Sequence, residues 1–233
     1  MHKTLIPATV AAVLCLASPH SVHGADAAPE PGTGSVPAGS YTLDKPHASL
    51  LFRVNHAGFS HWTARFTQFD AQLQFDPRQA AADRVTVTID PASITPDNPP
   101  PGFVASLRGA QWLNAGQFPQ ITYRSTRVEA AGQNALRIFG DLTLHGMTRP
   151  VVLEATYNGG YIGHPMDPHA RIGFSAHGTL KRSDFGIAYG IPQPGSTLGV
   201  SDAVEFLIEA EFSGPAWAGA GKAPAGNTPA GKH

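Results

Sequence analysis

Residues 204–212 read VEFLIEAEF, and this stretch decides the fold class. Apolar side chains occupy every second position from Val204 to Phe212, and three glutamates lie at positions between them. Because three carboxylates cannot all be buried without partners, one face of this segment must meet water while the other meets a core. The alternation therefore predicts a β-strand with one buried face.

Six further segments alternate in the same way. Their apolar faces lie within residues 50–56, 85–89, 121–125, 136–144, 151–157 and 172–180. Strands with one apolar and one polar face are typical of antiparallel sheets, whereas parallel sheets show continuous apolar runs. Residues 131–134 (AGQN) and 158–160 (NGG) are predicted as turns between strands. The sequence thus predicts an all-β fold, an antiparallel β-barrel of about eight strands, with a two-sheet sandwich as the alternative.

Residues 97–119, DNPPPGFVASLRGAQWLNAGQFP, interrupt this pattern. Three consecutive prolines exclude a central strand. Phe103, Leu107, Trp112 and Leu113 instead predict one or two short helical turns. Such an insert covers one end of a barrel, and the sequence fits a lid and a packing plug equally well.

The composition excludes several classes of function. Lys and Arg number 16 against 17 Asp and Glu, so no strong positive field exists to bind nucleic acid. Cys15 is the one cysteine of the chain, so an intrachain disulfide or a zinc ribbon is excluded. His164, His169 and Asp167 share a proline-containing loop, but their spacing does not predict a metal site. Because enzyme motifs such as a P-loop or G-x-S-x-G are absent, we expect no catalytic residues, no required cofactor and no enzyme activity.

The N-terminus predicts export. Lys3 precedes an apolar stretch over residues 5–17, and small residues follow before Ala25, which is the pattern of a cleaved signal peptide over residues 1–24. We therefore expect a periplasmic protein, with full secretion as the alternative. Residues 25–39 and 215–233 are rich in Ala, Gly and Pro and are predicted as a disordered linker and tail, which leaves residues 40–214 as the folded domain.

Six motifs carry a family resemblance. They are YTLDKPHA (41–48), FRVNHAG (52–58), FPQITY (118–123), GDLTLHGMTRPV (140–151), KRSDFGI (181–187) and SDAV (201–204). Together they resemble the YceI-like, polyisoprenoid-binding family of bacterial exported proteins over about residues 41–212. The resemblance implies a lipocalin-like barrel that holds an isoprenoid lipid, an isoprenoid quinone or a similar amphiphile without a covalent bond. It also implies that a homodimer is common and that no catalytic residue is defined.

The inward strand faces and the resemblance together predict a ligand-binding lumen. Its predicted wall comprises Phe52, Val54, His56, Phe103, Leu107, Trp112, Leu113, Tyr123, Leu142, Phe174, Arg182, Phe185 and Phe206. Gly140 and Gly178 lie inside strands, where they permit a bend or leave room in the lumen. Arg182 is interpreted as the partner of Asp184 in an ion pair that shapes a turn, with a head-group anchor as the alternative. His47, His56 and His145 lie at strand ends or turns. There they line the mouth of the lumen or form hydrogen bonds with backbone groups of the turns.

These features predict a periplasmic carrier that shields an isoprenoid tail from water. The sequence leaves two alternatives open. One is an accessory protein that presents a bound quinone to a membrane redox protein. The other is a stress-related interaction module whose core is filled and which binds no lipid.

Overall fold

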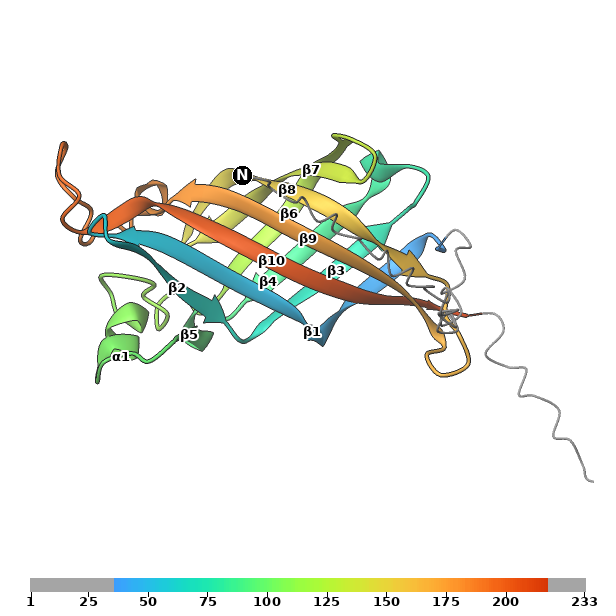
Figure 1. Ribbon diagram of the computed structural model, residues 1–233, viewed down its shortest axis with the longest axis horizontal. Helices are drawn as coiled ribbons and strands as arrows, with labels where there is room; N and C mark the ends of the chain where they lie inside the picture. The colour runs from blue at the N-terminus through green and yellow to red at the C-terminus, as the bar shows by residue number, and fades with distance from the viewer. Residues whose placement is uncertain (1–35, 218–233) are drawn as a thin grey trace, which may run out of the picture. The chain divides into compact units, whose positions relative to one another are not determined.

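The structure is a computed structural model that describes residues 36–217 (Figure 1). Its strands are β1 (Gly39–His56), β2 (Ser60–Phe66), β3 (Phe69–Phe75), β4 (Arg84–Ile89), β5 (Ile94–Pro96), β6 (Ile121–Ala130), β7 (Ala135–Leu144), β8 (Met147–Tyr161), β9 (His169–Lys181) and β10 (Val200–Ala216). One α-helix, α1 (Phe103–Arg108), and three 3-10 turns, η1 (Ala80–Ala82), η2 (Pro91–Ser93) and η3 (Arg182–Phe185), complete the described elements. Among residues 36–217, no helix has the length and apolar character that a membrane span requires.

Eight of the strands form a closed antiparallel barrel. They follow the order β10-β9-β8-β7-β6-β4-β3-β1, and β1 pairs with β10 to close the ring. The closure confirms the predicted barrel and excludes the two-sheet sandwich. Within this ring of eight strands, closure leaves no free sheet edge that could pair with another chain.

Strand β1 pairs with two different strands on one side. Its first residues, Gly39–Thr42, pair with β3, whereas Leu51–His56 pair with β2. Strand β2 in turn pairs with β5, which forms a small extension of the sheet beside α1 (Figure 1). Between its two halves β1 bulges, because Leu43 faces Phe212 but Ala48 already faces Ala210.

The predicted turn over residues 158–160 is wrong. Strand β8 continues through these residues to Tyr161, with an irregular register between Tyr157 and Gly159. A Cβ at Gly160 would lie 2.3 Å from the carbonyl oxygen of Arg171, so the glycine serves a close approach of two strands. The connection to β9 lies at residues 162–168 instead.

Aromatic rings pack the barrel end that holds the start of β1. Tyr41 is fully buried and meets Phe75 edge-on with 5.8 Å between ring centroids, and Phe75 stacks on Tyr157. Val36 packs into this cluster and the Trp217 amide donates to the Pro168 carbonyl at 2.7 Å. The fold therefore extends beyond the predicted bounds of 40–214 at both ends. The predicted signal peptide, residues 25–35 of the predicted linker, and the tail from 218 onward lie outside the described residues.

Candidate ligand-binding cavity

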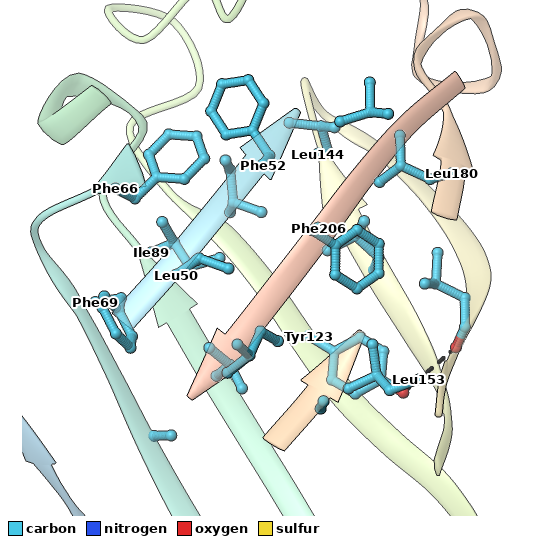
Figure 2. Close-up of a pocket in the computed structure, with 18 of the residues that line it drawn as sticks. Leu50, Phe52, Phe66, Phe69, Ile89, Tyr123, Leu144, Leu153, Leu180 and Phe206 are labelled. Carbon is cyan, nitrogen blue, oxygen red and sulfur yellow. Dashed lines mark hydrogen bonds between the residues drawn. The ribbon is translucent and has the colours of Figure 1, made fainter. Parts of the chain in front are cut away.

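The barrel encloses a cavity of 580 Å³ between the aromatic cluster and α1. Figure 2 shows Leu50 and Phe52 of β1, Tyr123 of β6 and Phe206 of β10 around it. Side chains from every strand of the barrel and from the α1 region form its wall. This volume is within the range of about 300–1,000 Å³ that is typical of small-molecule sites.

Several inward-facing side chains remain partly accessible, which shows that the centre is hollow. Phe174, Leu180, Phe206 and Ile208 all line the cavity, yet each is only half-buried. In a filled core these side chains would be covered by their neighbours. The alternative of a solid core is therefore wrong for this barrel.

The structure places the predicted lining residues on the cavity wall, with one exception. The residues at the wall are Phe52, Val54, His56, Phe103, Leu107, Trp112, Leu113, Tyr123, Leu142, Phe174, Arg182 and Phe206. Phe185 is the exception, because it lies on the turn η3 after β9 and is only 1% exposed among Leu144, Val151 and Ile187. Its side chain packs in the hydrophobic core beside the turn and does not face the lumen. The ligand-binding role of the other residues stays a prediction.

Gly140 and Gly178 make room for aromatic rings. A Cβ at Gly140 would lie 2.4 Å from Cζ of Tyr123, and a Cβ at Gly178 would lie 2.4 Å from Cζ of Phe206. Each ring thus lies flat across a neighbouring strand and takes the space of a missing side chain. The room that the sequence predicts at these glycines is therefore occupied by the protein itself, and the cavity lies beyond the rings.

The sequence model of the YceI-like domain matches residues 41–212. The chain belongs to the YceI-like family. This confirms the resemblance seen in the six sequence motifs.

Individual relatives agree with this membership. YceI of Escherichia coli is 41% identical over 158 residues, which cover 66% of this chain and 79% of that protein. The crystal structure of a Campylobacter jejuni YceI protein superposes with a TM-score of 0.59 at 31% identity, covering 75% of this chain and 98% of that one. A polyisoprenoid binding domain from Saccharophagus degradans, implicated in plant cell wall breakdown, has a TM-score of 0.54 at 14% identity with the same two coverages, and this likeness shows the fold.

Among residues 36–217, Arg182 is the one cation that is buried. Only 4% of it is exposed, and its guanidinium donates hydrogen bonds to four backbone carbonyls, those of Ile187, Tyr189, Val200 and Ser201. The predicted ion pair with Asp184 is wrong, because these carbonyls take the donors and Asp184 is exposed. Arg182 therefore ties η3, the following loop and the start of β10 together, and four of its five N–H groups are already used.

The remaining polar groups of the wall are few. Tyr123 donates its hydroxyl proton to the Ile138 carbonyl at 2.9 Å, and burial raises the pKa of this phenol. Asp83, which ends the connection between β3 and β4, and Arg84, the first residue of β4, also reach the wall. His56 is the one of the three candidate histidines that lines the cavity, since His47 bonds Asp44 and His145 bonds the Phe185 carbonyl.

The α1 region covers the other end of the cavity. Phe103 of α1 meets Trp62 of β2 edge-on at 5.7 Å, and Trp112 meets Tyr189 at 5.4 Å. The Trp112 ring also lies 5.2 Å from the guanidinium carbon of Arg182. The predicted helical insert is thus confirmed as a short helix and an aromatic cover over the lumen.

One charged cluster outside the lumen was missed from the sequence. Ligand atoms of Asp44, His47 and Glu211 lie within 4.8 Å of one another, at the bulge in β1. Arg171 contacts Asp44, Asp167 and Glu211, so a guanidinium already neutralises these carboxylates. The bulge brings Asp44 next to Arg171, which lies 127 positions later in the chain, and no local sequence pattern reports such a contact. We interpret the cluster as a network of ion pairs.

Proposed function

We propose that this chain is an exported carrier that holds an isoprenoid lipid, an isoprenoid quinone or a similar amphiphile inside its barrel. The observation that carries the proposal is the 580 Å³ cavity with an almost wholly apolar wall. Membership of the YceI-like family supports it. The same fold occurs in a domain from Saccharophagus degradans that is described as polyisoprenoid binding.

The physical basis of binding is burial of hydrocarbon. Each methylene that leaves water for an apolar site contributes about 0.8 kcal/mol, so an isoprene unit contributes roughly 4 kcal/mol before ordering costs. Tyr123 and Arg182 make their hydrogen bonds within the protein, which leaves few donors for a ligand. Affinity would therefore come from the chain of the ligand, and the head group would add little.

The place of action follows from the N-terminal sequence. The signal-peptide pattern over residues 1–24 supports export to the periplasm, where a water-insoluble chain needs shielding between membranes. A reversible carrier requires no covalent bond to its ligand.

The test is to identify what the purified mature protein contains. Native mass spectrometry followed by organic extraction should recover a lipid or quinone in the wild-type protein. Ala176→Phe places a ring in the middle of the cavity wall and should lower the recovered ligand at least tenfold. His177→Phe places the same phenyl ring on the exposed face of the same strand and should leave the ligand content unchanged.

A negative result is equally clear. If wild-type protein is recovered empty and takes up neither a quinone nor a polyprenyl lipid from detergent, the carrier proposal is wrong. Equal ligand content in Ala176→Phe and wild type would place the ligand outside the lumen and would also contradict it.

A further inference from the structure

Two loop tips beside α1 expose apolar side chains. Phe59, in the turn between β1 and β2, is 83% exposed, and Leu198, in the loop before β10, is 76% exposed. Tyr189 of the same loop is 51% exposed. Exposed apolar side chains that gather at one place on a soluble domain mark an interaction surface.

The two tips belong to one surface. The Ala57 amide donates to the Gly199 carbonyl at 2.7 Å, and a Cβ at Gly58 would lie 3.3 Å from the Thr197 hydroxyl. Figure 1 shows the loop before β10 and the turn between β1 and β2 at the same end of the barrel as α1. The contact between Tyr189 and Trp112 joins this surface to the aromatic cover of the cavity.

The two tips and the segment around α1 carry almost no charge. Residues 57–63 (AGFSHWT) and 186–199 (GIAYGIPQPGSTLG) contain no Lys, Arg, Asp or Glu, and Arg108 is the one such residue in 98–120. At the opposite end, by contrast, the bulge in β1 and the β8–β9 connection carry the Arg171 ion pairs with Asp44 and Asp167. A surface with protruding apolar tips and few charges suits insertion among lipid head groups, where burying a charge would be costly.

We propose that this end of the barrel docks on a lipid bilayer, with Phe59 and Leu198 inserted into the interface. The proposal rests on the proposed function, since a lipid carrier must exchange its ligand with a membrane. A bilayer fits better than a protein partner, because the side chains protrude singly from two tips, whereas a stable protein interface needs about 800 Å² of matching surface on each side. Docking here would place the membrane against the same cover that closes the cavity.

The mechanism predicts an unusual dependence on lipid charge and salt. Binding that depends on insertion of apolar tips without charged residues should be similar for phosphatidylcholine vesicles with and without phosphatidylglycerol, and it should survive high salt. Loss of one fully inserted aromatic or aliphatic side chain should weaken partitioning by about tenfold or more.

The experiment is vesicle co-sedimentation with the mature full-length protein. Phe59→Ser and Leu198→Ser should each lower the bound fraction, and the double variant should abolish binding. Met166→Ser is the matched control, because Met166 is 90% exposed in the β8–β9 connection at the opposite end, and it should bind like wild type. Thermal unfolding checks that all variants are folded.

Three results would overturn the docking proposal. The first is unchanged vesicle binding in the double variant, and the second is equal loss in Met166→Ser. The third is a shift from dimer to monomer in light scattering with no loss of vesicle binding, which would assign the surface to a second copy of the chain. Ligand uptake from detergent, measured by native mass spectrometry, separates this proposal from the carrier function, since the tip variants should still take up ligand in this way.

Discussion

Asp83 is a carboxyl that the fold buries beside the cavity. It is only 5% exposed, and its Oδ1 accepts a hydrogen bond from the Asp76 amide at 2.8 Å. Burial raises the pKa of Asp83 from 3.8 to about 6, and the hydrogen bond from Asp76 opposes only part of this effect. The fold therefore tolerates the neutral acid better than the carboxylate.

This raised pKa predicts a pH dependence of stability. The folded protein binds the Asp83 proton more tightly than the unfolded chain, so the free energy of unfolding falls as pH rises from about 4 through 6. A shift of this size is worth about 3 kcal/mol. In urea unfolding, Asp83→Asn should match wild type near pH 4 and become the more stable protein by up to that amount at pH 7.

An exposed carboxyl provides the comparison. Asp97→Asn should change the unfolding free energy by less than about 0.5 kcal/mol across the same pH range. A constant difference between Asp83→Asn and wild type from pH 4 to 7 would show that the Asp83 carboxyl is not disfavoured by the fold.

Arg182 shows how far residue types alone can be read. The sequence correctly predicts a structural role at a turn, because a guanidinium two residues from Asp184 suggests a side chain that shapes the connection. Its partners are backbone carbonyls of residues 187–201, which lie near Arg182 because β9 and β10 are paired. Carbonyl partners leave no trace in the sequence, whereas a nearby carboxylate does, so the wrong partner was predicted.

At the scale of single elements, strand β9 contains a direct test of ring packing against glycine. A Cβ at Gly178 would lie 2.4 Å from the Phe206 ring and 2.9 Å from the Val152 carbonyl, whereas a Cβ at Gly173 in the same strand meets nothing closer than 3.8 Å. Gly178→Ala should therefore destabilise the barrel by about 1–3 kcal/mol. Gly173→Ala should be neutral or stabilise it by up to about 1 kcal/mol, since glycine weakens a strand interior.

Chemical denaturation of both variants measures this difference. Combining Gly178→Ala with Phe206→Leu should recover part of the lost stability, because leucine lacks the ring that the new methyl group would meet. Equal effects of the two alanines would mean that Phe206 does not need the space at Gly178.

The strand pattern explains which elements could be predicted. Alternation identified the inward faces of seven segments correctly, because burial on one side imposes a period of two. Strand β3 was missed although Phe69, Ala71, Leu73 and Phe75 alternate with polar residues, so that signal was available. The short β5 was not predicted, since three residues cannot show a period. Residues 158–160 were mistaken for a turn because glycine is common in turns. Here glycine instead allows two strands to approach closely.

For the molecule as a whole, the hollow barrel implies that the free energy of unfolding depends on whether a ligand is bound. An empty apolar cavity lacks contacts on one side of its lining, so the ligand-free protein should be less stable than the loaded protein. Ligand at a hundredfold excess over its Kd should stabilise the fold by about 2.7 kcal/mol. Phe185 and the cluster around Tyr41 are already closely packed. The stabilisation by ligand should therefore come from filling the central cavity.

Ala176→Phe separates a hollow barrel from a filled one by its opposite effects on the two states. In delipidated protein the new ring should occupy empty space and raise the free energy of unfolding by about 1–2 kcal/mol. In the presence of a quinone or polyprenyl lipid the same variant should gain little further stability, whereas wild type and the outward-facing His177→Phe should gain the full amount. Thermal unfolding with and without ligand measures both effects. If Ala176→Phe instead destabilises the ligand-free protein, as overpacking of a filled core does, the barrel has no room for a ligand at its centre.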